Sequence, residues 1–375
     1  MRIAFVSDNT YPWFNGGIEK RRFIIMRKLA SEGNDVHCFT MHRPGMPGRE
    51  FSYKGIRYHS VGEALSWQGM YRGGSKRRSI RMPLIFAFGL LQKIFPYRFD
   101  VLDADNFPFL HLFPLYLYTR IRGTRFAITW HEVWSKKFWK RYLRGVGMVG
   151  YFVEWFCSRI GDVHIANVST TKELMVRELG VSPSKVVVLP VAIDSDEIRS
   201  FTRKRSYRRK KQFIVVSRLV KHKRVDLAIS AVAKTRAKLI VVGIGPDLPE
   251  LQELGKQLAP GRVSWLSNLP VERHYRLICE SKALIMASER EGLSLVTVEA
   301  LALGTPVVIT TTSSLPKELR GMCIETSDVR MHELLERMLA KNAKYERASK
   351  KLQEKVIAEF SADNAEQVYE NIAGR

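Results

Sequence analysis

Two carboxylates eight residues apart, Glu291 and Glu299, offer the clearest chemistry in the chain. The residues around them predict a strand over 283–287, a short polar loop, and a helix over about 294–303. Glu291 then lies in the loop at the carboxyl end of the strand, where open α/β sheets bind ligands, and Glu299 lies about one turn into the helix. The backbone N–H groups at the start of this helix can bind a phosphate, and they belong to Leu293, Ser294 and Leu295. Together these groups can hold a phosphorylated ligand that is rich in hydroxyls.

The segment EGLSLVTVEALALGTPVV, residues 291–308, resembles the E-x7-E signature of retaining glycosyltransferases with the GT-B fold. It is similar to the large GT4-like group of these enzymes, which uses nucleotide sugars. The match includes the small, apolar and Gly-Pro positions as well as the two acids. The resemblance implies that Glu291 contacts sugar hydroxyls of the donor and that Glu299 contacts its ribose. The alternative is a surface helix whose two acids are merely solvated.

A second segment that matches the family is SRLVKHKRVD, residues 217–226, which contains the cations Arg218 and Lys223. It resembles the family's G-R-L-x(3)-K-G-x-D pattern, which implies that Arg218 and Lys223 hold the donor diphosphate. Ser217 and Arg224 replace the two glycines of that pattern, so we expect a less tight loop. The cations would offset the negative charge that grows on the leaving nucleoside diphosphate, and this can replace a metal ion. The alternative is that both are ordinary members of an abundant basic population.

Glycines mark two further places that match the family. Gly16 and Gly17 stand between the first strand and the first helix, where they remove side chains from a backbone that must approach a diphosphate. A Gly-Gly turn before a helix is a weak signal alone, but its position directly after the first strand strengthens it. Gly245 belongs to a G-x-G-P turn at 243–246, and Asn268 lies where backbone groups of the family usually receive the nucleobase. We therefore predict that these residues bind the donor.

His131 follows a predicted strand in the sequence TWHEVW, residues 129–134, which resembles the His-Asp/Glu segment of the family. The resemblance implies that His131 lies near the anomeric carbon or the 6-hydroxyl of the sugar. There a neutral imidazole can donate or accept a hydrogen bond. The candidate catalytic residues are accordingly His131, Glu291, Arg218 and Lys223.

The order of predicted elements indicates two α/β halves. Strand patterns at 3–7, 36–40, 101–103, 126–130, 163–166 and 186–189 alternate with helical patterns, and a second series occupies 213–217, 239–242, 263–266, 283–287 and 306–310. We therefore expect the GT-B arrangement, two Rossmann-like domains that face a central cleft. The predicted domains are an acceptor-binding domain over 1–192, a nucleotide-sugar-binding domain over 193–358, and a C-terminal helix over 359–375 that crosses back to the first domain.

Composition restricts the compartment and the cofactors. A strand begins almost directly after Met1, so we expect no secretory leader. The cysteines form no CxxC or other metal-ligand spacing, which favours a reducing cytosol and no structural zinc. Asp103 and Asp105 have the spacing of a metal-binding DxD motif, but we expect them in a turn at the end of a strand, and we predict no metal site. The apolar stretches 82–91 and 107–118 are too short or too interrupted to cross a bilayer.

A net charge of +24 attracts polyanions, so nucleic acid and an anionic membrane must both be considered. Basic residues mix with aromatic residues over 72–98 and again over 136–144, a mixture that suits lipid headgroups. The alternative for either block is a solvated basic face, and no nucleic-acid-binding motif is present. We predict that the first domain docks on the membrane and presents the acceptor through Arg72, Lys76, Arg77, Arg78, Arg81, Lys136, Lys137, Trp139, Lys140 and Arg141.

These observations predict a retaining glycosyltransferase that moves a sugar from a UDP- or GDP-sugar to an acceptor hydroxyl. We expect the acceptor to be a lipid or a lipid-linked glycan, the enzyme to be peripheral on the cytoplasmic face of an anionic membrane, and the reaction to need no metal. A non-hydrolysing nucleotide-sugar epimerase of the same fold and a glycosyltransferase with a soluble acceptor are the alternatives. Neither the sugar, the base nor the linkage can be deduced from the sequence.

Overall fold

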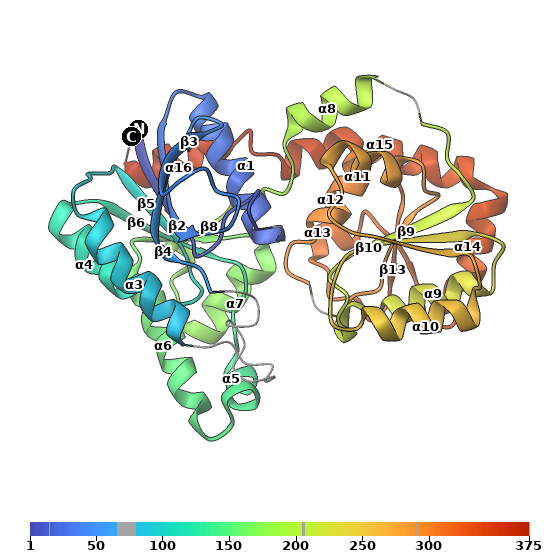
Figure 1. Ribbon diagram of the computed structural model, residues 1–375, viewed down its shortest axis with the longest axis horizontal. Helices are drawn as coiled ribbons and strands as arrows, with labels where there is room; N and C mark the ends of the chain where they lie inside the picture. Colours follow the sequence, from blue (N-terminus) through green and yellow to red (C-terminus); the bar gives the residue numbers. More distant parts are fainter. Residues whose placement is uncertain (15, 66–79, 205–206, 290, 375) are drawn as a thin grey trace. The chain divides into compact units, whose positions relative to one another are not determined.

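The computed structural model describes residues 1–375 except 15, 66–79, 205–206, 290 and 375. The chain forms two compact units (Figure 1). Unit 1 contains residues 1–191 together with the C-terminal segment 362–375, and unit 2 contains residues 192–361. The last helix of the chain therefore belongs to the same unit as the first strand.

Unit 1 is built on one twisted sheet. Its strands are β1 (Arg2–Val6), β2 (Asp35–His42), β3 (Glu50–Tyr53), β4 (Ile56–Glu63), β5 (Val101–Asp105), β6 (Arg125–Trp130), β7 (Val163–Ala166) and β8 (Val186–Val188). They lie in the order β3-β4-β2-β1-β5-β6-β7-β8. All neighbours pair in parallel except β3 and β4, which form an antiparallel edge. The central strands are buried along almost their whole length, as continuous apolar runs such as IAFV in β1 predict.

Helices cover both faces of this sheet. They are α1 (Gly17–Ser31), α3 (Arg81–Ile94), α4 (Leu112–Arg122), α5 (Lys136–Leu143), α6 (Gly147–Ile160), α7 (Ser169–Leu179) and α16 (Ala365–Ala373). Apolar side chains of α3, α4, α6 and α7 pack in one core cluster on one face. Those of α1 and α16 pack in a second cluster on the other face. The C-terminal helix thus closes the core beside α1, with Tyr369 fully buried.

Unit 2 repeats the plan with a fully parallel sheet. Its strands are β9 (Gln212–Val216), β10 (Lys238–Val242), β11 (Val263–Leu266), β12 (Leu284–Met286), β13 (Val307–Thr310) and β14 (Ile324–Thr326). They lie in the order β11-β10-β9-β12-β13-β14. Its helices are α8 (Ser195–Lys204), α9 (Val225–Ala233), α10 (Leu248–Leu258), α11 (Val271–Cys279), α12 (Leu295–Ala302), α13 (Lys317–Arg320), α14 (Met331–Ala340) and α15 (Asn342–Phe360).

Two groups of helices cover the sheet of unit 2. The side chains of α9, α10 and α14 enclose one core cluster with β9 and β10. On the other side of the sheet α12 packs against α11 and α15 (Figure 1). Both units are therefore α/β layers of the Rossmann type, as the alternation of strand and helix patterns predicted. Within the described ranges no helix is both long enough and apolar enough to cross a membrane.

The prediction that Trp139 belongs to an exposed membrane face is wrong. Its side chain is only 6% exposed and packs against α6, where a β-carbon at Gly150 would lie 2.1 Å from the indole ring. The indole N–H donates to Oε2 of Glu154 at 2.6 Å, and the backbone N–H of Trp134 donates to Oε1 at 2.7 Å. Trp139 therefore anchors α5 to α6 instead of facing the solvent.

Glu154 is a buried acid with an altered titration. Burial raises its pKa from the ordinary value of 4.5 to about 7, although the two N–H donors from Trp134 and Trp139 oppose this shift. Between these two pH values the folded protein keeps the proton on Glu154 while the unfolded chain has lost it. The unfolded state then binds fewer protons, so the free energy of unfolding falls as the pH rises through this window.

We predict that the stability difference between the wild type and Glu154→Gln changes with pH. The wild type should lose up to about 3 kcal/mol relative to this variant between pH 4.5 and 7, because a shift of one pKa unit is worth about 1.4 kcal/mol. Urea unfolding of both proteins at several pH values measures the difference. Glu173→Gln on the exposed side of α7 is the control for the same substitution at an exposed position. A pH-independent difference for Glu154→Gln would contradict the raised pKa.

Candidate donor-binding site

The sheet of unit 2 reverses its winding direction beside β9. From β9 the chain proceeds to β10 and β11 on one side, then returns to place β12 on the other side of β9 and continues to β13 and β14. The loops that follow β9 and β12 therefore diverge at the carboxyl ends of two neighbouring strands. Open α/β sheets bind ligands in the crevice that forms at such a switch point. The segments with Arg218 and Lys223, after β9, and with Glu291, after β12, lie at this point.

An ion pair joins the two loops. Nζ of Lys223 donates to Oε1 of Glu291 at 2.7 Å, with the two side chains only 11% and 15% exposed. The next residues reinforce the contact, since Arg224 donates to Glu289 at 3.0 Å. Arg218, by contrast, is exposed at the carboxyl end of β9. The structure thus brings a cation and a carboxylate together at the point where sequence patterns predicted a diphosphate and a sugar.

The loop after β10 approaches the loop after β9 so closely that side chains are excluded. A β-carbon at Gly245 would lie 2.2 Å from the backbone oxygen of Leu219. The backbone N–H of Leu219 donates to the oxygen of Ile244 at 2.9 Å and fixes this approach. Gly245 is therefore held against the loop that carries Arg218, which explains the requirement for glycine in the G-x-G-P turn.

Helix α12 starts immediately after Ser294, so the N–H groups of its first turn have no acceptor within the helix. The predicted residues Leu293, Ser294 and Leu295 lie at this start, close in sequence to Glu291. The hydroxyl of Ser294 contacts that of Thr297 at 2.9 Å. Because positive potential gathers at a helix N-terminus, an anion can be bound there.

Glu299 is buried inside α12 and contacts a residue that the sequence did not indicate. Its side chain is 5% exposed, and Oε2 lies 3.1 Å from Nε2 of His274 on α11. His274 has no motif of its own, so only the packing of α11 against α12 identifies it. The sequence offered one weak indication. Pro270 immediately precedes α11, and His274 lies four residues later, near the start of that helix. His274 orients the carboxylate that we expect to meet the ribose.

Asn268 follows β11, the edge strand that lies beside β10. Its backbone is left-handed, with φ of 49°, a conformation that Asn adopts more readily than most residues. The side chain is exposed. The sheet therefore places Asn268 at its carboxyl edge but further from Glu291 than the loop after β9.

Unit 1 has its own switch point, between β1 and β5. Gly16 precedes α1 and Gly17 is its first residue, so both lie at the carboxyl end of β1 as predicted from the sequence pattern. A β-carbon at Gly16 would lie 2.0 Å from Oε2 of Glu19. The carboxylate of Glu19 therefore lies over the start of α1, where the N–H groups of the first turn attract negative charge.

His131 follows β6 and is 7% exposed. Its Nε2 lies 2.8 Å from Oδ1 of Asp105, the last residue of β5. Burial alone would raise the pKa of Asp105, but Arg22 and His131 lower it well below its usual range, so this carboxyl is ionised. The ionised carboxylate can only accept a hydrogen bond, so Nε2 carries the hydrogen of this contact, and Nδ1 is the ring nitrogen left for another partner. Asp105 therefore fixes both the orientation and the tautomer of His131.

The expectation of a turn at Asp103 and Asp105 is wrong, because both residues belong to β5 itself and are buried. Arg22 donates to Oδ2 of Asp103 at 2.6 Å, and the hydroxyl of Tyr369 donates to the same oxygen at 2.5 Å. Thr129 donates to Oδ1. These partners engage the Asp103 carboxylate inside the fold. Among the residues that the structure describes, no group of His, Cys, Asp and Glu side chains could hold a metal ion.

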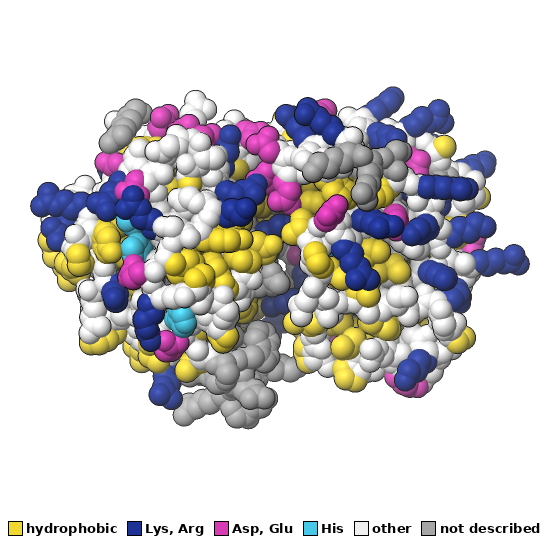
Figure 2. Space-filling model, turned by 45° about the horizontal axis from the view of Figure 1, so that its top comes forward, with side chains coloured by type: hydrophobic (Ala, Val, Ile, Leu, Met, Phe, Trp, Pro, Cys, Tyr) yellow, Lys and Arg dark blue, Asp and Glu magenta, His cyan; other side chains and the backbone are white. Residues whose placement is uncertain are grey.

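The predicted basic face is only partly described. Arg81, Lys136, Lys140 and Arg141 are exposed on α3 and α5. Lys137 lies on α5, but its side chain is outside the description, and four predicted residues lie outside the described ranges altogether, namely Arg72, Lys76, Arg77 and Arg78. Unit 2 also carries many Lys and Arg side chains on its surface (Figure 2). Positive charge is therefore a property of both units.

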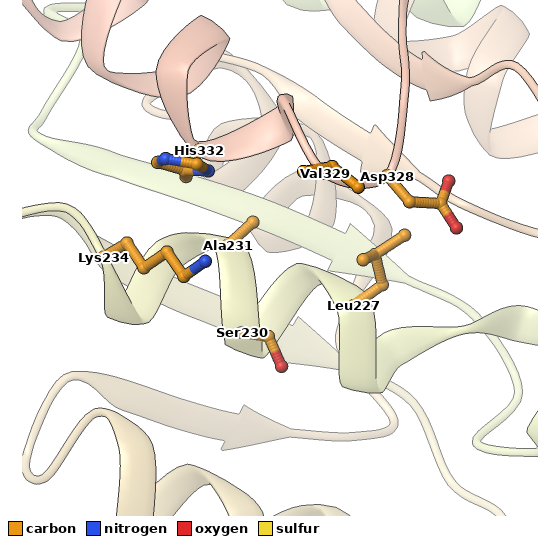
Figure 3. Close-up of a pocket in the computed structure, with 7 residues that line it drawn as sticks. All are labelled: Leu227, Ser230, Ala231, Lys234, Asp328, Val329 and His332. Atoms are coloured by element: carbon orange, nitrogen blue, oxygen red, sulfur yellow. The ribbon is translucent and has the colours of Figure 1, made fainter.

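A cavity of about 280 Å³ lies elsewhere in unit 2, between α9 and the start of α14 (Figure 3). It is lined by Leu227, Ser230, Ala231, Lys234, Asp328, Val329 and His332. Its wall contains none of the residues predicted to bind the donor. Asp328 is already paired with Arg224 at 3.7 Å. The residues predicted to bind the diphosphate and the sugar of the donor thus lie at the switch point and not in this cavity.

Comparisons with known proteins agree with this geometry. The family model described as "Glycosyltransferase Family 4" matches residues 15–197, and the model "Glycosyl transferases group 1" matches residues 196–355. The phosphatidylinositol N-acetylglucosaminyltransferase GPI3 subunit of Saccharomyces cerevisiae (strain YJM789) is 26% identical over 340 residues, which is 84% of this chain and 69% of the relative. The N-acetylgalactosamine-N,N'-diacetylbacillosaminyl-diphospho-undecaprenol 4-alpha-N-acetylgalactosaminyltransferase of Campylobacter jejuni is 32% identical over 162 residues, which is 43% of this chain and 44% of the relative.

Solved structures share the fold. Sucrose-phosphate synthase from Thermosynechococcus elongatus has a TM-score of 0.78 at 16% identity and covers 100% of this chain and 99% of its own. Anabaena HepE in complex with UDP-glucose has a TM-score of 0.74 at 15% identity, with 100% of both chains covered. The two family models together span the ion pair at the switch point, the buried His131 and both Rossmann-like units. The chain belongs to the GT4-like glycosyltransferases of the GT-B fold.

Proposed function

We propose that this glycosyltransferase moves a sugar, with retention of configuration, from a UDP- or GDP-sugar to a hydroxyl of a lipid or lipid-linked saccharide. The acceptor would be presented at the cytoplasmic face of a membrane. The observation that carries the proposal is the ion pair between Lys223 and Glu291 at the switch point of unit 2. A nucleotide diphosphate sugar contains both groups that such a pair can recognise, an anionic diphosphate and sugar hydroxyls.

Donor binding exchanges the partners of this ion pair. The diphosphate offers Lys223 more negative charge than one carboxylate does, so its ammonium group turns from Glu291 to the phosphate oxygens. The carboxylate of Glu291 then accepts hydrogen bonds from the sugar hydroxyls. Each buried group keeps a partner throughout, which avoids the cost of about 1 to 3 kcal/mol or more for leaving a polar group unpaired. Glu291 positions the sugar in this scheme and is not a nucleophile.

The leaving diphosphate is stabilised by protein groups alone. Arg218 and Lys223 supply two cations from the loop after β9, and Gly245 lets a backbone approach them closely. The N–H groups at the start of α12 and at Gly16 and Gly17 are the further candidates for phosphate contacts. Fixed cations and N–H dipoles act most strongly on charge that develops in the transition state. We therefore propose that turnover needs no metal ion.

The nucleoside is held by the buried acid and the edge loop. Glu299 accepts hydrogen bonds from the ribose hydroxyls, with His274 keeping its carboxylate in place at 3.1 Å. The backbone around Asn268 receives the base. Since these contacts are remote from the reacting carbon, they contribute to binding of the donor in the ground state and in the transition state alike.

Transfer itself occurs next to His131. Its ring is oriented by the ionised Asp105, which leaves Nδ1 to accept a hydrogen bond from a sugar or acceptor hydroxyl. Retention follows from a front-face route, in which the departing phosphate takes the proton of the acceptor hydroxyl as the new glycosidic bond forms. The bond between the anomeric carbon and the phosphate oxygen breaks, and the nucleoside diphosphate leaves.

The relatives support a lipid-linked acceptor. One acts on phosphatidylinositol according to its name, and another on a diphospho-undecaprenol saccharide. Both names contain an anionic lipid, with a phosphatidyl group in one and a lipid diphosphate in the other. The exposed cations Arg81, Lys136, Lys140 and Arg141 of unit 1 fit such a headgroup. A GT-B epimerase would have no need for an acceptor of this kind.

The proposed function is tested by the acceptor dependence of nucleoside diphosphate release. Purified protein is incubated with each of a panel of UDP- and GDP-sugars, with and without a detergent-dispersed total lipid extract. We expect one donor to release nucleoside diphosphate only when lipid is present, with transfer of labelled sugar into the organic phase. Interconversion of the nucleotide sugars without lipid would identify an epimerase, and equal transfer to small soluble sugars would identify a soluble acceptor.

Variants of Glu299, proposed to bind the donor, and of His131, proposed to act in transfer, should affect different kinetic constants. Glu299→Ala should raise the dissociation constant of the donor about 10- to 100-fold, because it removes charge-assisted hydrogen bonds to the ribose. His131→Ala should lower kcat by about 10²-fold or more with little change in donor affinity, because its hydrogen bond acts at the reacting centre. Donor titration and steady-state kinetics measure both, with the exposed Glu336→Ala of α14 as the control. Unchanged turnover in His131→Ala would remove it from the site.

Chelation should leave the activity intact. The cations Arg218 and Lys223 take the position that a divalent ion would have at the diphosphate, so turnover in EDTA should equal turnover with added Mg²⁺ or Mn²⁺. The double variant Arg218→Gln, Lys223→Gln should lose activity in both conditions. Loss of wild-type activity in EDTA, with recovery on addition of metal, would show that the reaction depends on a metal.

A further inference from the structure

The exposed apolar side chains of the chain concentrate on one part of unit 1. Thirteen of the seventeen large hydrophobic side chains that are exposed in the described part of the chain lie between residues 80 and 156. They are Ile80, Leu84, Phe88 and Leu91 on and beside α3, Phe113, Tyr116, Leu117 and Ile121 on α4, and Val146, Val149, Phe152, Trp155 and Phe156 on and beside α6. Isolated apolar residues on a surface need no explanation, but a contiguous group of this size does.

These side chains form one surface, which we call the outer apolar face. Helix α4 packs against both α3 and α6 (Figure 1). The rings of Phe113 on α4 and Phe156 on α6 are stacked with their centroids 5.7 Å apart. The opposite sides of the same helices hold the buried cluster, with Phe86 and Leu90 of α3 fully covered. Each helix is therefore apolar on two sides, and only one of them packs on the sheet of unit 1.

A helix that is apolar all round is normally buried in a core or in lipid. The three helices have 14, 11 and 14 residues, and at about 1.5 Å per residue none is long enough to span a bilayer of about 30 Å. Helices of this kind can lie in the headgroup region with one side in the acyl boundary. The aromatic members Phe88, Phe152 and Trp155 suit that boundary.

The exposed charges on the helices of the outer apolar face and on α5 are all positive. Helices α3, α4 and α5 contain no Asp or Glu, and the one acid of α6, Glu154, is fully buried. Exposed cations on these elements are Arg81, Lys93, Arg120, Lys136, Lys140, Arg141 and Arg159. Two of them have acidic neighbours on other elements, since Arg120 pairs with Asp162 at 2.8 Å and Lys93 lies 4.0 Å from Glu50. Since these helices carry no exposed acid of their own, positive charge predominates at the border of the apolar surface.

This arrangement decides between possible occupants. In a symmetric dimer the same face would meet its own copy, and cations at the border would be brought near cations. An anionic bilayer offers an apolar interior beneath a negatively charged surface, which complements both features at once. We propose that the outer apolar face of α3, α4 and α6, with the cations of α5 at its border, is the surface by which unit 1 inserts into an anionic lipid bilayer.

The proposal deepens the proposed function, on which it rests for the presence of a lipid-linked acceptor, and it changes the docking surface predicted from the sequence. Helices α4 and α6 replace Trp139, which faces inward, as the source of apolar contact. Cations attract the protein to the surface over a distance that salt limits to about 10 Å at 0.1 M. Apolar insertion persists when the charge is screened, so the two contributions can be measured separately.

The test is flotation of the full chain with vesicles of phosphatidylcholine alone and with phosphatidylglycerol added, at low salt and at 0.5 M NaCl. The variant Phe88→Gln, Leu117→Gln, Phe152→Gln changes one exposed residue on each helix, with exposures of 64%, 52% and 59%. The control Leu258→Gln, Val329→Gln changes two exposed apolar residues of unit 2, at 43% and 80%. Circular dichroism and thermal unfolding verify that every protein is folded, which exposed positions should allow.

We expect the wild type and the control to bind anionic vesicles and to keep part of that binding at 0.5 M NaCl. The triple variant should bind at least about tenfold more weakly at low salt and should lose all binding at high salt, because three apolar side chains that would insert into the bilayer are replaced. Binding of the triple variant equal to that of the wild type would overturn the proposal. So would a wild type that ignores vesicles but forms a dimer that the triple variant abolishes, since the outer apolar face would then meet a second copy.

Activity distinguishes this proposal from the proposed function. The triple variant should transfer sugar to a detergent-dispersed acceptor at the wild-type rate and fail only with acceptor embedded in vesicles. If the wild type transfers to dispersed lipid but does not float, the docking surface is wrong and the function stands. If the wild type floats as expected but transfers sugar to no lipid, the docking surface stands and the proposed function is wrong.

Discussion

In a parallel sheet that is covered on both faces, the strands themselves are buried and apolar. Polar residues that bind ligands therefore lie at the edge where the strands end at their carboxyl termini. Both units obey this constraint. Lys223 and Glu291 lie beyond β9 and β12, and His131 lies beyond β6, each just outside a strand whose interior is apolar. Because neighbouring strands run in the same direction, residues far apart in sequence meet at this edge. The ion pair of Lys223 with Glu291 spans 68 residues for this reason.

Unit 1 also buries polar groups away from this edge, and one such network joins three of its elements. Arg22, Asp103 and Tyr369 are buried, and they come from α1, β5 and the C-terminal helix α16. Burial opposes the charge on Arg22, but Asp103 and Asp105 raise its pKa overall, so the guanidinium stays charged. Removing Arg22 or Asp103 would break a buried ion pair, at a cost of about 3 to 5 kcal/mol. The same Arg22 also lies 3.4 Å from Asp105, which orients His131, so the network that fixes α16 also fixes the candidate catalytic ring.

The fold was predictable from the sequence, and the partners of the site residues were not. The alternation of strand and helix patterns predicted both Rossmann-like units. A parallel sheet that is covered on both faces has buried strands, and such strands are recognisable in the sequence as continuous apolar runs. The E-x7-E segment indicated a loop at Glu291 and a helix at Glu299, and these are their positions in the structure. The contacts of His274 with Glu299 and of Asp105 with His131 were missed, since contacts between elements depend on helix packing and strand order, which a local pattern does not contain. Trp139 was assigned to the wrong side because α5 is short and carries aromatic residues on more than one side.

Charge and apolar exposure carry different information about location. A net charge of +24 is spread over both units, so it raises the affinity for any polyanion without choosing a surface (Figure 2). Apolar exposure is local, because most of the exposed large apolar side chains in the described ranges lie on and beside α3, α4 and α6. Such a surface lowers the solubility of a protein unless a partner covers it. The helices that form it carry no exposed acid, which favours a partner with negative charge. The coincidence of the two features on the same helices supports the proposed docking on an anionic bilayer, while either feature alone would fit several partners.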